Sequence, residues 1–185
     1  MSEKAITIYT PSDADPHITA DDDAFIYDSI LGGRSGILGD MTCDISTGSV
    51  VLEGGGVSNR GYILRIPSGE NVTLTVPTGS QGLNRIDTVV SQFTKGAGTV
   101  ADQHTIELVK GTAADSPVPP TLTESDLTNT GDVNQVALYY VLVSGVEVAG
   151  IIPIAETLGI GDSSVQVYVQ SEQPTSPEMG DLWFW

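Results

Sequence analysis

Residues 71–76, NVTLTV, and residues 136–143, VALYYVLV, decide the fold class of this chain. The first segment alternates apolar and polar side chains, which is typical of a strand with one buried face. The second segment is a nearly unbroken apolar run, which is typical of a strand buried on both faces, at the centre of a sheet or at a subunit interface. Both segments therefore predict β structure.

The same reasoning predicts further strands at residues 41–45, 49–53, 62–66, 85–93 and 104–109. Short strands at regular spacing, joined by turns, are typical of an all-β sandwich or barrel. A parallel sheet needs crossover helices, and no segment after Gly36 has a helical pattern. We therefore expect a mainly β fold: an antiparallel β-sandwich or barrel-like domain with one short N-terminal helix and a short C-terminal extension.

The one predicted helix begins near Thr19 and ends before the glycine pair at 32–33. Thr19 is expected to cap the helix, and the three aspartates at 21–23 suit the positive end of the helix dipole. Glycine just after the last periodic residue is a helix stop signal. The helical spacing then gives one apolar stripe, formed by Phe25, Ile26, Ser29 and Ile30.

These patterns divide the chain into three parts. Residues 1–38 are an N-terminal arm and the short helix, residues 39–160 are the β-sandwich or barrel domain, and residues 161–185 are a C-terminal docking segment. Within the arm, residues 5–10 are predicted as a short strand or extended segment. Residues 117–120, PVPP, are expected to be extended and outside any central strand, because proline cannot donate to a sheet.

The C-terminal docking segment ends in Trp183, Phe184 and Trp185, which are the candidate interface residues. Tryptophan is enriched at the energetic centres of protein interfaces, so the three side chains are suited to anchoring in a neighbouring subunit. Tryptophan also stacks on sugars, and that alternative stays open at this stage.

Composition restricts the partners. The 185 residues include 7 Lys and Arg against 24 Asp and Glu, a formal net charge of −17. Such a surface repels phosphate backbones and anionic lipid, so neither nucleic acid nor a membrane surface is expected as a partner. Cys43 is the only cysteine and forms no intrachain disulfide. We expect no secretory signal and no membrane span, and synthesis in a reducing cytoplasm.

The motifs of catalysis and metal binding are not found in the sequence. His17 and His104 are the only histidines and lie far apart, and no nucleophile elbow or phosphate-binding loop is present. The aspartates between residues 13 and 23 lack the spacing of a calcium loop, so helix capping and a solvated face are the favoured interpretation. We expect no enzyme, no cofactor, no metal and no catalytic residue.

Three stretches in fixed order carry a family resemblance: residues 83–90 (LNRIDTVV), residues 109–120 (VKGTAADSPVPP) and residues 134–143 (NQVALYYVLV). They resemble a structural module of phage and prophage tail-tip proteins from Gram-positive hosts, over about residues 20 to 158 of this chain. The module often closes with an I-x-D-x-R segment, whereas this chain reads IAETL at 154–158. Any salt bridge made by that arginine is therefore absent or replaced here.

The resemblance implies a virion protein of the tail tip or baseplate, or the shoulder of a receptor-binding protein, that acts by subunit assembly and attaches other tail proteins. It also implies a homo-oligomer, with a trimer favoured. A carbohydrate-binding protein that recognises a host cell-wall saccharide is the alternative. Arg85 and Asp87 lie two apart on one predicted strand and so on one face, and we expect a structural ion pair or turn ligand there.

Overall fold

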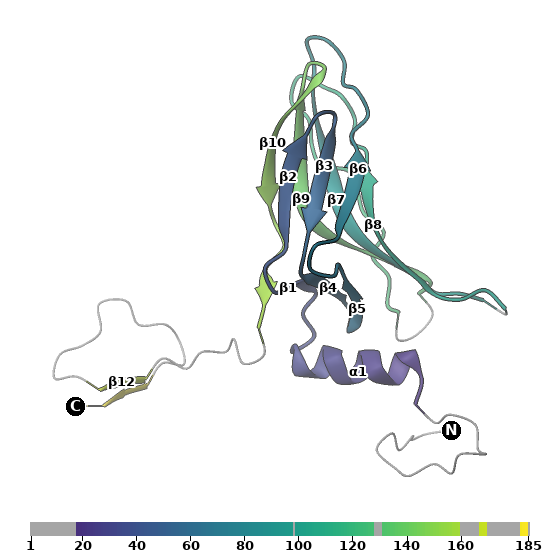
Figure 1. The fold of residues 1–185 in the computed structure, drawn as a ribbon, viewed down its shortest axis with the longest axis vertical. Coiled ribbons are helices and arrows are strands. Elements are labelled where there is room, and N and C mark those ends of the chain that lie inside the picture. The colour runs from purple at the N-terminus through teal and green to yellow at the C-terminus, as the bar shows by residue number, and fades with distance from the viewer. Residues whose placement is uncertain (1–17, 98, 128–130, 160–166, 170–181, 185) are drawn as a thin grey trace.

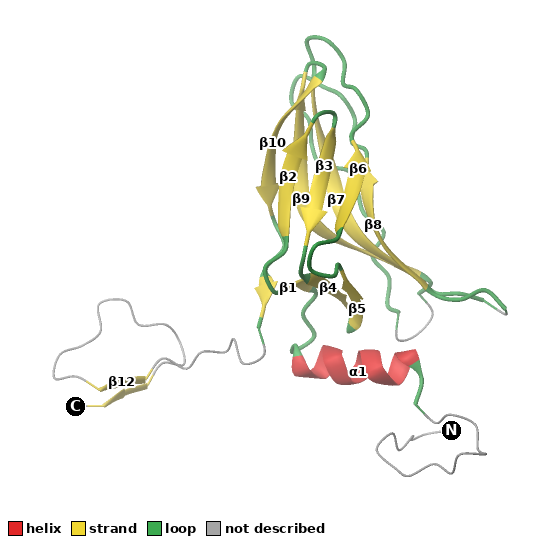
Figure 2. Cartoon of the chain, viewed as in Figure 1, coloured by secondary structure: helices red, strands yellow, loops and turns green. Residues whose placement is uncertain are grey.

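The computed structural model describes residues 18–97, 99–127, 131–159, 167–169 and 182–184. One helix stands at one end of an elongated β structure (Figures 1 and 2). The elements, in chain order, are α1 (Ala20–Ile30), β1 (Gly36–Leu38), β2 (Thr42–Ser46), β3 (Ser49–Glu53), β4 (Gly56–Asn59), β5 (Tyr62–Arg65), β6 (Asn71–Thr75), β7 (Asn84–Thr94), β8 (Gln103–Val109), β9 (Val133–Ser144), β10 (Glu147–Pro153), β11 (Thr157–Leu158), β12 (Val167–Val169) and β13 (Leu182–Phe184).

The strands form a sandwich-like body with a smaller sheet at its base. The larger layer has the strand order β10-β9-β7-β8, and the layer opposite it has the order β2-β3-β6. The base sheet has the order β11-β1-β4-β5, and all pairings in these three sheets are antiparallel except β1 with β11. The predicted fold class, a mainly β sandwich or barrel-like domain with one short helix, is confirmed.

The main core lies between the two layers of the sandwich. Alternate residues of β3 point into it, as do Tyr139, Val141 and Val143 of β9, and Leu138 joins them at a register shift between β7 and β9. Val50, Leu52, Leu138 and Val141 are completely buried there. At about 25 cal/mol per Å² of apolar area removed from water, contacts of this kind supply most of the favourable free energy of folding. This core fixes the relative position of the layers.

The apolar segment 136–143 lies in β9, between β10 and β7, at the centre of a sheet as predicted, but one of its faces is only partly buried, so the predicted burial on both faces is wrong. Its burial is unequal on the two faces, because Tyr139 and Val141 are buried in the core whereas Tyr140 and Leu142 are partly exposed. A strand in a sandwich turns one face toward the core. Its outer face is buried only where another segment of the chain packs on it.

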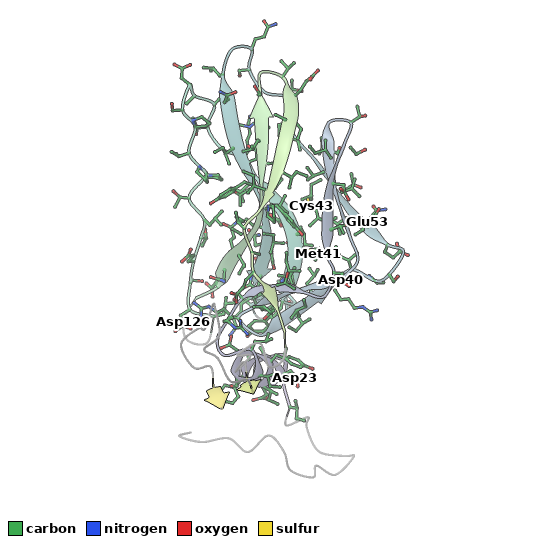
Figure 3. The ribbon with its side chains drawn as sticks, turned by 90° about the vertical axis from the view of Figure 1, so that its left-hand side faces the viewer. Asp23, Asp40, Met41, Cys43, Glu53 and Asp126 are labelled. Atoms are coloured by element: carbon green, nitrogen blue, oxygen red, sulfur yellow. The ribbon has the colours of Figure 1, made fainter. Side chains whose placement is uncertain are left out.

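The segment 111–127 provides part of that cover. Ala114 forms a bridge with Asn84 at the start of β7, and the carbonyl oxygen of Thr123 accepts a hydrogen bond from the backbone N–H of Gln135 in β9 at 2.8 Å. Figure 3 shows this connection on the side of the sheet that faces away from β2 and β3. Residues 117–120 belong to it and lie outside the strands, as predicted.

Helix α1 has the predicted start and stop. Thr19 and Asp22 form a capping box, in which the Thr19 side chain accepts from the Asp22 N–H and the Asp22 carboxylate accepts from the Thr19 N–H at 2.7 Å. Gly32 and Gly33 both have positive φ and terminate the helix. The described residues contain no helix that is long and apolar enough to cross a membrane.

Several predicted features lie outside the described residues. The predicted arm at residues 5–10, His17 and Trp185 are among them. Trp183 and Phe184 belong to β13, whose backbone pairs in parallel with β12, and their side chains are outside the described part of the structure. The interface assignment of these three residues therefore stays a prediction.

Candidate functional site

Helix α1 and the residue that precedes its N-cap carry four exposed apolar side chains. Phe25 is 66% exposed, Ile30 51%, and Tyr27 and Ile18 47% each. Two of the four, Phe25 and Ile30, belong to the predicted apolar stripe, whereas Tyr27 lies two positions from Phe25 and therefore on a different side of the helix. An amphipathic helix normally turns its apolar stripe toward the core, so this orientation is the reverse of the usual one.

A small residue and a glycine turn explain why the apolar stripe points outward. The β4–β5 hairpin meets α1 at Gly61, where an added Cβ would lie 1.9 Å from the carbonyl oxygen of Ala24. Ala24 is the one fully buried residue within the helix. Because backbone approaches backbone this closely, only the side of α1 without bulky side chains fits against the hairpin.

Polar contacts hold the helix in this orientation. Asp21 accepts a hydrogen bond from the hydroxyl of Tyr62 and forms an ion pair with Lys95, with 3.2 Å between Nζ and Oδ2. Tyr62 stacks on Phe93 with 3.8 Å between ring centroids, and Leu127 completes this small second core. Burial, followed by the hydrogen bond and charge of Asp21, raises the pKa of Tyr62, so its hydroxyl stays protonated as a donor.

The charge on α1 has one sign. The helix contains Asp21, Asp22, Asp23 and Asp28 and no basic residue. Lys95 neutralises part of the charge of Asp21, whereas Asp23 is exposed at the same end of the molecule (Figure 3). The exposed apolar side chains of α1 are therefore carried by a helix whose charged residues are all acidic.

At the opposite end of the sandwich, Arg85 and Asp87 form a bidentate ion pair on one face of β7. Nε of Arg85 lies 2.7 Å from Oδ1 of Asp87, Nη2 lies 2.9 Å from Oδ2, and both side chains are buried. Arg85 also donates to the carbonyl oxygens of Pro77 and Thr78, and Asp87 accepts from the Gly111 N–H at 2.8 Å. The predicted ion pair is confirmed, and it ties two loops to the strand.

Ser91 and His104 form a close pair that sequence reasoning did not identify. Their side chains lie 2.7 Å apart, from Oγ to Nε2, across the β7–β8 hairpin. Ser91 is completely buried, and burial lowers the pKa of His104 from 6.5 to about 4. Neither residue lines any of the clefts described below. A buried hydroxyl beside a neutral imidazole, away from a cleft, is suited to joining two strands rather than to attacking a substrate.

Neither Cys43 nor the acidic side chains belong to a described group suited to catalysis or metal binding. Cys43 is partly buried in β2, and desolvation followed by the charge of Asp44 raises its pKa to about 11, which disfavours the reactive thiolate. Within the described ranges, no group of three or more His, Cys, Asp and Glu side chains is placed to hold a metal ion.

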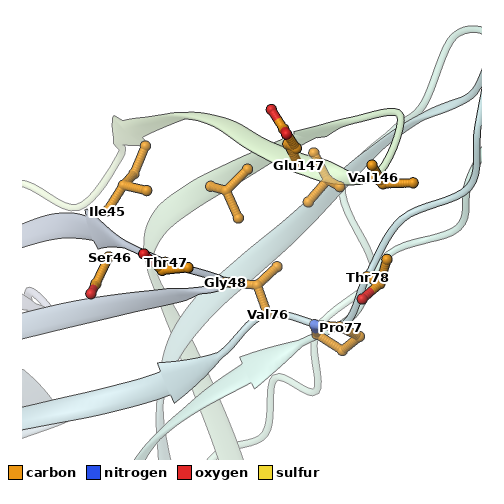
Figure 4. Close-up of a pocket in the computed structure, with 11 residues that line it drawn as sticks. Ile45, Ser46, Thr47, Gly48, Val76, Pro77, Thr78, Val146 and Glu147 are labelled. Carbon is orange, nitrogen blue, oxygen red and sulfur yellow. The ribbon is translucent and has the colours of Figure 1, made fainter.

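Two clefts lie near the base of the molecule and share Arg60, Glu124 and Asn134. Arg60 is an exposed residue at the tip of the β4–β5 hairpin with φ of 51°. A third cleft, of about 470 Å³, opens at the far end of the sandwich and is lined by polar side chains such as Thr78 and Glu147 and by apolar ones such as Val146 (Figure 4). The two clefts near the base, which we call the basal clefts, carry several polar side chains, and the third cleft has both polar and apolar side chains.

Comparison with known proteins adds no relative to this description. No protein-family model matches the chain, and no curated protein matches it.

Proposed function

We propose that this chain is a structural component of a bacteriophage or prophage tail tip or baseplate, and that it acts by subunit assembly and by attaching other tail proteins. The observation that supports the assembly role is the exposure of three large apolar side chains, Phe25, Tyr27 and Ile30, on the short helix α1. Exposed large apolar side chains gathered on one short element mark a candidate interaction site, on a chain whose net charge of −17 otherwise favours solvation.

The tail assignment rests on the order and spacing of the three motifs at residues 83–90, 109–120 and 134–143. In the structure the first motif supplies the buried Arg85–Asp87 pair, the second supplies the cover on the outer face of the sheet, and the third supplies the central strand β9. The motifs thus have mutually dependent structural positions, which favours a shared module over three separate coincidences.

Homo-oligomerisation, with a trimer favoured, is part of the proposal. The experiment is light scattering on the full chain and on a version truncated after Gly161, which removes Trp183, Phe184 and Trp185. A trimer in both versions supports assembly through the β domain, and a trimer lost on truncation supports assembly through the C-terminal docking segment. A monomer in both versions contradicts the oligomeric part of the proposal.

Recognition of a host cell-wall saccharide is the second candidate, and the basal clefts beside Arg60 favour it. Ser35, Arg60, Glu124 and Gln135 place hydroxyl, guanidinium, carboxylate and amide groups around the openings. Such groups bind sugar hydroxyls by hydrogen bonds. Binding on a glycan array that is lost in an Arg60→Ala variant supports this candidate, whereas silence of the wild-type chain on the array removes it.

A further inference from the structure

We propose that His104 makes the attachment of α1 sensitive to pH: when its imidazole takes up a proton, the contact between α1 and the body opens while the sandwich stays folded. This inference goes beyond the proposed function and does not depend on it. It follows from a layer of buried polar side chains that separates two apolar clusters, and from the place of His104 in that layer.

The two apolar clusters follow one another along the strands. On the inward face of β7, Val89 belongs to the main core and Phe93 to the small second core, with Ser91 between them. On the inward face of β8, Ile106 belongs to the main core and His104 lies opposite Phe93 in the register. Helix α1 contributes a residue to the second core and none to the main one, so the second core is the cluster that holds the helix.

Four polar side chains lie between these clusters, and we call them the polar layer: Asn59, Ser91, His104 and Asn134. The carbonyl oxygen of Ser91 accepts from the amide of Asn59 at 3.1 Å, and its hydroxyl lies 2.7 Å from Nε2 of His104. The amide of Asn134 donates to Oδ1 of Asn59 at 2.7 Å. Because hydrogen bonds separate the two clusters here, the second core can open as a local unit while the main core stays packed.

His104 is the member of the polar layer whose charge changes with pH, because the other three carry an amide or a hydroxyl group. Its Nε2 meets the hydroxyl of Ser91, and among the described residues Nδ1 has no hydrogen-bond partner. Phe93 contacts the ring edge-on, with 5.6 Å between centroids. A protonated ring would hold a positive charge and two N–H donors in this site, which costs free energy when only one acceptor is present.

The charged and titratable groups of the surrounding elements lie further from the ring. Within the described part of the chain none of them forms a hydrogen bond or an ion pair with it: Asp21, Arg60, Tyr62, Arg65, Lys95, Asp102, Glu107, Glu124 and Asp126. Burial is the cause that lowers the pKa of His104 to about 4. Opening of the second core brings water to the ring and removes this cause, so uptake of a proton favours the open state.

A continuous series of contacts leads from His104 to α1. Phe93, which touches the imidazole, stacks on Tyr62 with 3.8 Å between ring centroids. The hydroxyl of Tyr62 donates to Asp21 of the helix, and Leu127 packs in the same cluster. Because Tyr62 covers Phe93 and holds α1 at the same time, its departure exposes the ring pair and frees the helix together. Protonation of His104 and release of α1 are therefore coupled.

The experiment is hydrogen exchange of the full chain at pH 7 and pH 5, corrected for the effect of pH on the intrinsic exchange rate. Wild type is compared with His104→Gln and with His17→Gln, which replaces the other histidine. In wild type and His17→Gln the protection of α1 should fall by about 20-fold between pH 7 and pH 5. This factor follows from a pKa of 6.5 for an accessible ring and about 4 for the buried one.

Strands β3 and β9 should keep their protection at both pH values, and α1 of His104→Gln should show no fall. Each version is compared with itself at two pH values, so a lower starting protection in His104→Gln does not affect the result. An equal fall in His104→Gln and wild type, no fall in wild type, or an equal fall in β3 and β9 overturns the inference.

Asp21→Asn separates the imidazole from the carboxylate that also holds α1. The substitution removes the ion pair with Lys95, so it should lower the protection of α1 by the same factor at both pH values and leave the fall between them. A fall that disappears in Asp21→Asn would assign the pH response to the carboxylate and overturn the inference.

Titration of the His104 imidazole by NMR tests the coupling in the wild-type chain, with His17→Gln used to assign the two histidine signals. The midpoint should lie well below 6.5, and the protection of α1 should fall over the pH range between 6.5 and that midpoint. A midpoint near 6.5, or full protection of α1 throughout that range, overturns the inference.

Discussion

The side-chain amide of Asn134 donates a hydrogen bond to the Oδ1 of Asn59 at 2.7 Å, and the amide of Asn59 donates back to the backbone carbonyl of Asn134 at 3.0 Å. Both residues are buried, and Asn59 also donates to the carbonyl oxygen of Ser91 at 3.1 Å. This pair joins β4 in the base sheet to β7 and β9 in the sandwich. It fixes the hairpin on which α1 rests.

Replacing Asn134 by alanine should destabilise the protein strongly. The change leaves the Oδ1 of Asn59 and the N–H of Ser125 without their partner, and each unpaired buried polar group costs about 1–3 kcal/mol. The free energy of unfolding, measured by chemical denaturation, should fall by about 2–4 kcal/mol. Asn71→Ala, at an exposed strand end, is the control and should change it by less than about 0.5 kcal/mol. Equal effects of the two changes would show that the buried pair is dispensable.

Replacing Gly61 by alanine should displace α1. The added Cβ would lie 1.9 Å from the carbonyl oxygen of Ala24, and Gly61 has φ of 80°. Gly69→Ala is the matched control, since Gly69 has φ of 85° but no atom within 4 Å of the added Cβ. The free energy of unfolding of this control should fall by about 1 kcal/mol, through backbone strain alone.

The free energy of unfolding should fall further in Gly61→Ala than in Gly69→Ala. The backbone amides of α1 should also exchange with solvent faster in Gly61→Ala than in the wild type. Hydrogen exchange and denaturation measure the two effects. Similar losses of stability with unchanged exchange in α1 would contradict the close contact between helix and hairpin.

Replacing Asp87 by asparagine should remove the partner of a buried charge. Breaking one side of a buried ion pair typically costs about 3–5 kcal/mol, because the remaining charge stays uncompensated. Glu156→Gln is the control: it breaks the exposed pair with Arg34, whose atoms lie 3.3 Å apart, and should cost about 1 kcal/mol or less. Denaturation measures both. An Asp87→Asn variant as stable as the control would show that Arg85 and Asp87 serve another purpose.

The pKa of His104 predicts the pH dependence of stability. Burial lowers this pKa from 6.5 to about 4, so the unfolded chain takes up the proton first as the pH falls below 6.5. The free energy of unfolding should therefore decrease from pH 6.5 toward pH 4 and gain nothing from His104 above pH 6.5. The decrease in melting temperature between pH 7 and pH 5 should be smaller in His104→Gln than in the wild type. Equal decreases would place the pKa of His104 near its ordinary value.

Local patterns in the sequence were sufficient for much of the fold. The N-cap at Thr19 and the pairing of Arg85 with Asp87 are local features of one segment each, so the sequence pattern alone predicts them. Alternation at residues 71–76 and the apolar run at 136–143 likewise identify strands, because each pattern has the period of the structure it forms.

Contacts between distant residues could not be predicted in this way. Asn59 and Asn134 are 75 positions apart, and Ser91 meets His104 only because of the register of the β7–β8 hairpin. Helical spacing places Phe25 and Ile30 in one predicted apolar stripe with Ile26 and Ser29, but it does not show which way that stripe points. The orientation depends on the close approach of Gly61 to Ala24, which is a tertiary contact.

The most direct test of the proposed assembly role is the solution mass of the wild-type chain over a range of concentrations, measured by light scattering. The proposal predicts a mass of three chains of 19.4 kDa each that persists on dilution. A mass of 19.4 kDa at every concentration would contradict the role of the chain as a self-assembling structural protein.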